Sequence, residues 1–400
     1  MPAAASSATR RRHGTIAALA TAAALLPVVA GCGAPGGSNG SHDAPIKVGL
    51  VYSKTGPLAS YGKQYYQGFQ AGLHYATHGT STVNGRKIEV SVKDDTGDPA
   101  KAVAAAKDLI GNGDDIIAGS VVSGIAVQLA PIAKQNQVLF ISGPAATDAV
   151  TGANRYTFRS GRQTYQDILT AKSFIGNASG KHVVVLAQDD AFGHANVTAV
   201  KQVLGAQGAR VSSVLAPEAA TDLTPFATQA RNAKPDLLFV AWAGTNATAL
   251  WTALNQQGVL DSTTTVTGLD QRSSYPVFAA THGKVSFLAH YVPGGTHNAA
   301  ADAMRSYLTA HGEQSDLFTP DGFTAAQMIV RAAGHAGDVN AMITSLQGWS
   351  FNGVKGGLTI RKADHALLQP MFQAKLNGTT PEIVKTIPAG KVAPPVHKMG

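Results

Sequence analysis

Short apolar runs alternate with stretches of helical periodicity along most of this sequence, and that alternation limits the possible folds more than any other feature. The first four strand-like runs lie at residues 46–51, 88–92, 116–119 and 138–141, with helical spacing between them. Short apolar strands separated by helices are typical of a parallel sheet that is covered on both faces. We therefore predict a doubly wound α/β lobe for this part of the chain.

A second block repeats the same alternation further along the chain. Its strand-like runs lie at residues 182–187, 211–215, 237–241 and 265–268. A chain of 400 residues exceeds the roughly 250–300 residues at which single cores stop growing, so two cores are expected. The predicted fold class is α/β, with two doubly wound Rossmann-like lobes.

The chain is expected to cross between the two lobes near residues 159–162, near residue 293 and near residues 351–353. Three short crossings favour a hinge between the lobes rather than a fixed interface. The expected first lobe covers residues 45–160 plus 293–351. The expected second lobe covers residues 161–292 plus 352–390, and a C-terminal tail covers residues 391–400.

The N-terminal segment has the pattern of an export signal. Arginines at 10–12 precede an apolar run over residues 16–30, which is shorter than the roughly 20 residues of a membrane-spanning helix. Cys32, the only cysteine, follows this run, and the residues after it are mostly Gly, Ser, Asn and Pro. We predict a signal peptide over residues 1–31 and a flexible tether over residues 32–44.

Charge and composition argue against a nucleic-acid partner and against a metal site. The formal charge is +8, but three of the 32 basic residues lie in the predicted signal and the others form no basic stripe. Asp94, Asp95 and Asp98 favour a turn and a helix N-cap over a calcium loop, because Pro99 suits a first helical position and the EF-hand spacing is absent. We expect no metal, no cofactor and no nucleic acid.

A candidate ligand site follows the strand at residues 138–141. The strand ends in Ser-Gly-Pro and small residues, which is typical of a tight loop whose backbone N–H groups can hold an anion. Ser123 follows the neighbouring strand, so it should share with Ala145 and Thr147 the carboxyl edge at which open α/β sheets bind ligands. The alternative role of Ser123 is that of a helix N-cap.

Several motifs in their order along the chain resemble one known family. They are Ile46-Lys47-Val48-Gly49-Leu50 with Gly56-Pro57, the run DDTGDPAKAV, Ser-Gly-Pro-Ala-Ala-Thr, Asp189-Asp190 with Phe192-Gly193, and Thr359 to His365. This order resembles type I periplasmic-binding proteins and, more narrowly, the branched-chain amino-acid (leucine/isoleucine/valine) substrate-binding lipoproteins of ABC importers. Ala30-Gly31-Cys32 likewise resembles the lipobox in which the cysteine of bacterial lipoproteins is acylated.

The resemblance implies a site for an amino acid between two closing lobes. It places the ligand's carboxylate on the Ser123 hydroxyl and on loop amides. It places the ammonium on the carbonyl or hydroxyl of Thr147 and on Asp270, with aromatic side chains around both. The residues so implied are Tyr61, Ser123, Ala145, Ala146, Thr147, Phe192, Trp242 and Asp270. Asp270 could instead be a solvated loop acid, and Trp242 could instead belong to the core.

Two residues depart from the family pattern and leave the ligand's side chain open. Phe192 stands where leucine-type members carry a tyrosine, and Asp270 stands where they carry a longer glutamate.

The implied function is an extracytoplasmic, lipid-anchored, monomeric substrate-binding protein that hands its ligand to ABC permease subunits. The alternatives are a sensing lobe for a signalling partner and an importer component for a carboxylate or amide other than an amino acid. No catalytic triad can be assigned, so no enzyme activity is expected.

Overall fold

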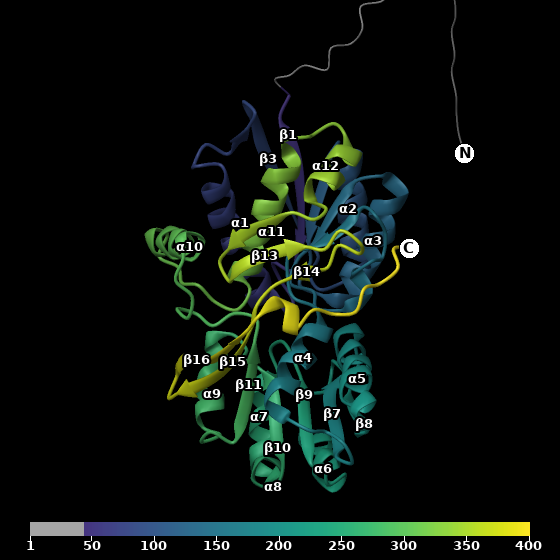
Figure 1. Cartoon of the computed structure of the whole chain (residues 1–400), viewed down its shortest axis with the longest axis vertical. Helices are drawn as coiled ribbons and strands as arrows, with labels where there is room; N and C mark the ends of the chain where they lie inside the picture. The colour runs from purple at the N-terminus through teal and green to yellow at the C-terminus, as the bar shows by residue number, and fades with distance from the viewer. Residues whose placement is uncertain (1–43) are drawn as a thin grey trace, which may run out of the picture. The chain divides into compact units, whose positions relative to one another are not determined.

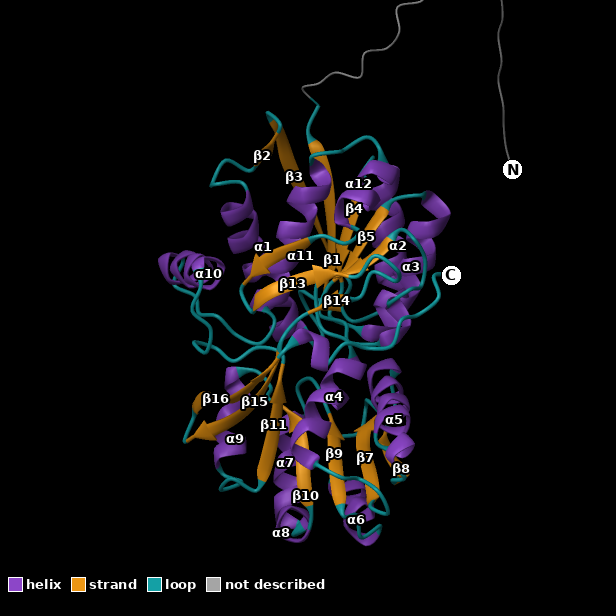
Figure 2. Cartoon of the chain, in the orientation of Figure 1, coloured by secondary structure: helices purple, strands orange, loops and turns teal. Residues whose placement is uncertain are grey.

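The computed structural model describes residues 44–400, in which two mostly parallel sheets are each covered by helices (Figures 1 and 2). We call the six-stranded sheet with its covering elements the first lobe, and the seven-stranded sheet with its covering elements the second lobe. This architecture confirms the predicted α/β fold class. The predicted signal peptide, Cys32 and almost all of the predicted tether lie outside the described residues.

The first lobe contains strands that run parallel to one another except for the short edge strand β2. In sheet order the strands are β2 (Thr82–Val83), β3 (Arg86–Asp94), β1 (Ile46–Tyr52), β4 (Ile116–Gly119), β5 (Leu139–Ser142) and β6 (Thr157–Arg159). The carboxyl ends of β4 and β5 are neighbours, as the prediction of a ligand site there requires.

The second lobe adds two antiparallel strands to a parallel sheet, and both come from the C-terminal part of the chain. In sheet order the strands are β16 (Thr380–Ile387), β15 (Met371–Asn377), β11 (Val285–Ala289), β10 (Thr264–Gly268), β9 (Leu237–Ala241), β7 (His182–Gln188) and β8 (Arg210–Ala216). The strands β11 and β16 are not among those predicted.

Helices cover the sheets in both lobes (Figure 2). Those that pack in the first lobe are α1 (Ala59–Ala76), α2 (Pro99–Gly111), α3 (Ser123–Asn136), α10 (Ala299–Ala310), α11 (Thr319–Ala333) and α12 (Val339–Leu346). Those that pack in the second lobe are α4 (Thr164–Ile175), α5 (Ala191–Val203), α6 (Thr224–Asn232), α7 (Ala247–Gln256), α8 (Val259–Ser262) and α9 (Tyr275–Ala279). Within residues 44–400 no helix is long and apolar enough to span a membrane.

Local sequence signals set several element ends. Asp98 is the N-cap of α2, where its carboxylate accepts from the amides of Ala100 and Lys101, and Pro99 takes the first helical position as predicted. Gly119 ends β4 with φ +117, and a Cβ there would lie 1.8 Å from the Val51 carbonyl oxygen. Only glycine fits this close approach of backbone to backbone.

Helices α1 and α11 pack closely because each carries a glycine at the contact. A Cβ on Gly68 of α1 would lie 1.8 Å from the Thr319 carbonyl oxygen, and one on Gly322 of α11 would lie 1.9 Å from the Tyr65 carbonyl oxygen. This contact joins residues more than 250 positions apart in sequence, so it holds the returning chain on the first lobe, as predicted for α10 and α11.

The third crossing lies later than predicted. Strands β12 (Ser350–Gly353), β13 (Gly356–Ile360) and β14 (Leu367–Leu368) form a small antiparallel sheet. Leu358 and Ile360, which the prediction assigned to the second lobe with the rest of residues 352–390, are buried in the hydrophobic cluster of the first lobe. The chain therefore enters the second lobe between β14 and β15, and the predicted bound at residue 352 was wrong for this segment.

The C-terminal residues make a fourth connection that the sequence did not indicate. Val392 is buried with Met371 in the second lobe. Beyond it the chain runs back along the first lobe, where the guanidinium of Arg361 donates to the Pro394 carbonyl and the Gly400 amide donates to the Gly152 carbonyl. The segment predicted as a tail is thus ordered against both lobes.

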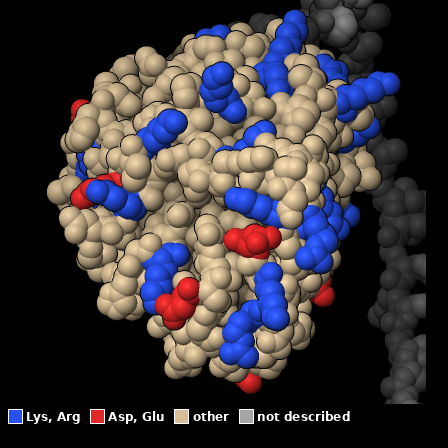
Figure 3. Space-filling model, turned by 60° about the horizontal axis from the view of Figure 1, so that its bottom comes forward, with Lys and Arg blue, Asp and Glu red and all other residues tan. Residues whose placement is uncertain are grey.

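Charged side chains are mixed on the surface. On the face drawn in Figure 3, Lys and Arg side chains are spread out with acidic side chains between them. This face carries no continuous basic stripe of the kind that tracks a phosphate backbone.

A buried ion pair lies where the lobes join. Lys355 Nζ lies 2.8 Å from Asp321 Oδ1, and both side chains are fully buried. Asp321 Oδ2 lies 3.4 Å from His290 Nε2 in the second crossing, and a Cβ on Gly161 in the first crossing would lie 3.1 Å from the same oxygen. One carboxylate therefore contacts two of the segments that connect the lobes.

We expect Lys355→Met to lower the free energy of unfolding by about 3–5 kcal/mol, because it leaves the buried Asp321 carboxylate without its cation. Urea denaturation followed by circular dichroism measures this loss. Lys375→Met is the matched control, since Lys375 pairs with Glu382 on the surface and exposed pairs contribute at most about 1 kcal/mol. Equal losses in the two variants would contradict the role given to the buried pair.

Candidate functional site

Two adjoining cavities lie between the lobes. The larger cavity has a volume of about 450 Å³ and is lined by first-lobe residues such as Ser123 and Ala146 and by second-lobe residues such as Glu218 and Asn246. The smaller cavity has a volume of about 70 Å³ and lies mainly against the second lobe. Tyr61, Arg162, Phe192, Ala243 and Phe318 line both cavities, so the two form one continuous cleft.

The N-terminus of α3 faces the larger cavity. Ser123 and Gly124 line it, and the N–H groups of a first helical turn have no partner inside the helix. Val122 takes the N-cap position, and Ser123 Oγ instead accepts from the Thr147 amide at 3.3 Å. The alternative reading of Ser123 as only a helix N-cap is therefore not what the structure shows. A helix N-terminus favours an anion.

The loop after β5 contributes one of its three predicted amides to the cavity wall. Ala146 lines the larger cavity, and its N–H donates to no group within residues 44–400. Ala145 and Thr147 are buried and do not line this cavity. Their amides already donate, that of Ala145 to the Ser120 carbonyl and that of Thr147 to Ser123 Oγ. The structure thus brings Ser123 and Ala146 to the cleft and places Ala145 and Thr147 behind them.

Asp270 and Tyr61 meet across the cleft. The Tyr61 hydroxyl on α1 donates to Asp270 Oδ1 at 2.6 Å, and the Ser274 hydroxyl donates to Oδ2 at 2.7 Å. Burial raises the pKa of Asp270, although these two hydrogen bonds lower it again in part. Both residues were predicted as ligand contacts, and their contact links the first lobe to the second. Asp270 is therefore a structured cleft residue and not a solvated loop acid.

Aromatic rings form much of the cleft wall. Phe192 and Trp242 line the smaller cavity as predicted, and Trp242 Nε1 donates to Asn246 Oδ1 at 2.9 Å. Trp242 is also part of the second-lobe core, as its alternative role predicts. Phe318, at the N-cap position of α11, packs edge-on against Tyr61 with ring centroids 5.0 Å apart. No sequence pattern singles out Phe318.

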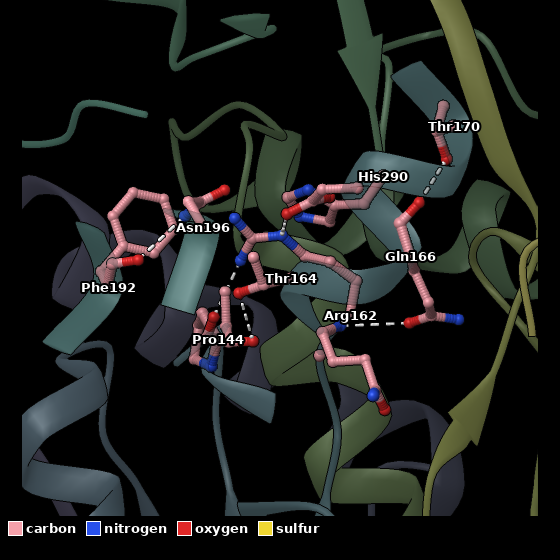
Figure 4. A network of polar contacts seen from close by, with 12 residues as sticks. Pro144, Arg162, Thr164, Gln166, Thr170, Phe192, Asn196 and His290 are labelled. Carbon is pink, nitrogen blue, oxygen red and sulfur yellow. Dashed lines mark hydrogen bonds and ion pairs between the residues drawn. The ribbon is translucent and has the colours of Figure 1, made fainter. Parts of the chain in front are cut away.

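Arg162 is the main site residue that sequence reasoning missed. It was identified only as part of a crossing, yet it lines both cavities, and Figure 4 shows its side chain among its polar contacts. Arg162 Nη1 donates to the Pro144 carbonyl at 2.9 Å, and its guanidinium carbon lies 5.6 Å from the centre of the Phe318 ring. The available signal in the sequence was a basic residue directly after Gly161, within the predicted crossing at residues 159–162.

The smaller cavity is also lined by three buried polar side chains, Asp167, Asn196 and His290, of which Figure 4 labels the last two. Burial raises the pKa of Asp167 to about 6, although Arg162, whose Nε lies 3.3 Å from Asp167 Oδ2, lowers it. Burial lowers the pKa of His290 to about 4, so this imidazole is neutral at pH 7. None of the three was predicted, because they come from separate helices and loops.

The arrangement suits binding rather than chemistry. Ser123 Oγ contacts a backbone amide and no histidine, so it lacks the base that a nucleophilic serine needs. Residues 44–400 contain no cluster of His, Cys, Asp or Glu that could hold a metal ion. What the cleft offers is a set of N–H donors on one side, acceptors on the other, and aromatic rings between them.

The sequence matches the periplasmic binding protein family over residues 45–381. A Leu/Ile/Val-binding protein of Rhizobium johnstonii is 25% identical over 312 residues, which cover 76% of this chain and 84% of the relative. A homologous Leu/Ile/Val-binding protein of Brucella melitensis is 24% identical over 312 residues, or 76% of this chain and 83% of that protein.

Solved structures agree with this assignment. An ABC-type branched-chain amino acid transporter protein from Rhodopseudomonas palustris is 30% identical, with a TM-score of 0.73 over 88% of this chain and 99% of that one. An ABC transporter solute-binding protein of the same species, solved with p-hydroxybenzoic acid, shares the fold at 22% identity and a TM-score of 0.79, over 87% and 98% of the chains. The chain belongs to the periplasmic binding protein family, as an extracytoplasmic solute-binding component of an ABC transporter and not an enzyme.

Proposed function

We propose that this protein captures an amino acid between its lobes and delivers it to the permease of an ABC importer. The observation that carries the proposal is the opposition of donors and acceptors in one cleft. The α3 N-terminus, Ala146 and Arg162 present N–H groups on one side, and Asp270 presents a carboxylate on the other. A zwitterion is the small solute that satisfies both sides.

The ligand's carboxylate is assigned to the first-lobe side of the larger cavity. Ser123 Oγ and the amides of Ser123, Gly124 and Ala146 supply hydrogen bonds, and the helix dipole adds a favourable field. The guanidinium of Arg162 adds a full positive charge beside the Pro144 carbonyl. Ala145 and Thr147 support this seat from behind, since Ser123 Oγ is held by the Thr147 amide.

The ligand's ammonium is assigned to Asp270. Each of its two oxygens already accepts one hydrogen bond, and each can accept a second one. Tyr61 orients the carboxylate, while Phe192, Trp242 and Phe318 exclude water and strengthen the ionic contacts. Because Tyr61 and Asp270 belong to different lobes, a ligand on Asp270 is seated where the cleft closes.

The relatives support an amino acid without fixing its side chain. The similar proteins of Rhizobium johnstonii and Brucella melitensis carry names for leucine, isoleucine and valine binding. A second candidate is an aromatic carboxylate, which the Arg162 guanidinium beside three aromatic rings favours. Solute-binding proteins of Rhodopseudomonas palustris solved with hydroxybenzoates share the fold.

We further propose that the mature protein begins at Cys32 and is held on the membrane by acyl chains on that residue. An export signal followed by a lipobox-like Ala-Gly-Cys supports this, and two acyl chains give stable anchoring. The polar residues up to position 44 then act as a tether that lets a monomeric binding protein reach its permease.

An amino acid that binds as proposed should stabilise the protein by about 2.7 kcal/mol at a hundredfold excess over Kd. A thermal-shift screen of twenty amino acids and a set of benzoates measures this effect. Asp270→Asn should weaken amino-acid binding by about thirtyfold or more, because the ammonium loses its buried counter-charge. Asp261→Asn, at an exposed carboxylate, is the control. A shift with benzoates alone would replace the first proposal by the second.

Amino-acid binding should weaken as pH falls below neutral. The pKa of Asp270 is raised by burial, so protons compete with the ligand's ammonium for this carboxylate at a higher pH than usual. Isothermal titration calorimetry between pH 8 and pH 5 should show Kd rising as pH falls, and Asp270→Asn should flatten that dependence. An affinity that increases on acidification would contradict the ammonium seat.

Cys32→Ser should release the protein from the membrane. We expect wild-type protein in the membrane fraction and incorporation of labelled palmitate, with both lost in the variant. Ser38→Cys in the Cys32→Ser background is the control, because it restores a thiol outside the lipobox. Membrane retention of Cys32→Ser would refute acylation at this residue.

A further inference from the structure

The smaller cavity contains a group of buried acceptors that the proposed carboxylate and ammonium seats do not use. Asp167 Oδ1 is buried and has no hydrogen-bond partner within residues 44–400. Asp167 lies on α4, is 5% exposed and lines this cavity. A buried carboxylate oxygen without a partner is costly, and it indicates a group that arrives from outside the chain.

The polar neighbours of Asp167 have their donors engaged and their acceptors free. Asn196 Nδ2 donates to the Phe192 carbonyl at 2.9 Å, and His290 Nε2 lies 3.0 Å from the Leu317 carbonyl. With the proton of the neutral imidazole on Nε2, Nδ1 is an acceptor. Within residues 44–400, Asn196 Oδ1 and His290 Nδ1 accept no hydrogen bond.

Two other donors around the cavity, from Thr267 and Trp242, are engaged in the same way. The Thr267 hydroxyl donates to the Val240 carbonyl at 2.9 Å, and Trp242 Nε1 donates to Asn246. Arg162 Nη1 donates to the Pro144 carbonyl, whereas Arg162 Nε, 3.3 Å from Asp167 Oδ2, makes no hydrogen bond within residues 44–400. The free positions of this cavity are thus mainly acceptors, and the group that fills them must donate.

The charge and size of the cavity restrict that donor further. Arg162 lies 3.3 Å from Asp167 and offsets its negative charge, so a second cation is disfavoured. A volume of about 70 Å³ admits an amide or a hydroxyl together with its carbon, but no large ring. Asp270 opens on the same cavity, so this group lies close to the ligand's ammonium.

We infer that the smaller cavity is a side-chain subsite for a neutral hydrogen-bond donor, which makes the solute an amino acid with an amide or hydroxyl side chain. This inference rests on the proposed function, since it takes Asp270 as the ammonium seat. It departs from the leucine, isoleucine and valine preference that the names of the relatives carry. A purely aliphatic side chain leaves Asp167, Asn196 and His290 unsatisfied.

Two isosteric pairs of ligands test the subsite. Asparagine and leucine have nearly the same shape, as do threonine and valine, and in each pair only the first carries a side-chain donor. Isothermal titration calorimetry on the purified, solute-stripped wild-type protein should give Kd values at least about tenfold lower for asparagine and threonine. An ordered water in the cavity would give no such preference.

Variants assign the preference to its residue. In Asp167→Leu the ratio within each pair should fall to about twofold or less, while leucine and valine still bind and so report an intact cleft. Asp108→Leu makes the same change at an exposed carboxylate that pairs with Lys93, and it should keep the wild-type ratio. Should Asp167→Leu fail to fold, Asn196→Leu removes a second acceptor of the same subsite and should reduce the ratio at least threefold.

The outcomes separate this inference from the function on which it rests. Binding of all four amino acids without preference overturns the subsite and leaves the amino-acid proposal standing. Binding of none of the four overturns both. A preference that survives both Asp167→Leu and Asn196→Leu overturns the assignment of the subsite to these residues.

Discussion

The Asp321 carboxylate lies fully buried where the lobes join, and the cleft depends on its neutralisation. Lys355 supplies the cation at 2.8 Å from the turn between β12 and β13, in a segment that the prediction placed in the wrong lobe. Because Asp321 also contacts His290 and packs against Gly161, it fixes the first and second crossings relative to α11. Arg162 and His290, which belong to those two crossings, then line the cleft. A buried ion pair is a weak source of stability, but an unpaired buried charge is prohibitive, so the geometry around Asp321 is strongly constrained.

The cleft combines two kinds of recognition with different freedom to change. Its first-lobe side is built from backbone N–H groups at the α3 N-terminus and at Ala146, whose positions follow from the parallel sheet and its helix. Its second-lobe side is built from side chains, namely Asp167, Asn196, Asp270 and His290, which single substitutions can alter. In the proposed function the first side holds the ligand's carboxylate, and the second side sets which ligand is preferred.

Elements that depend on local pattern were predicted well, and contacts that depend on long-range packing were not. The strand Leu237–Ala241 and the helix Ala299–Ala310 lie at the predicted residues, because apolar runs and 3.6-residue spacing are local signals. Strand β13 was predicted as a strand but in the wrong lobe, since an apolar run does not specify which core buries it. Ser123, Ala146, Tyr61, Phe192, Trp242 and Asp270 reach the cleft, whereas the amides of Ala145 and Thr147 are already engaged by the loop itself. Arg162, Phe318, Asp167, Asn196 and His290 come from separate segments, so only the folded structure shows that they line one cavity.

By itself the sequence determined the α/β class, the existence of two lobes, most strand positions and the carboxyl edge that borders the cleft, since each follows from spacing along the chain. Only the tertiary structure decided which side chains face that edge and whether their hydrogen-bonding groups are free. Whether Asp167 is satisfied depends on atoms contributed by α5, by the segment after β11 and by the first crossing, and no local pattern carries that information. Secondary structure is encoded over a few residues, but the hydrogen-bonding state of a cleft is a sum over segments that meet only when the chain is folded.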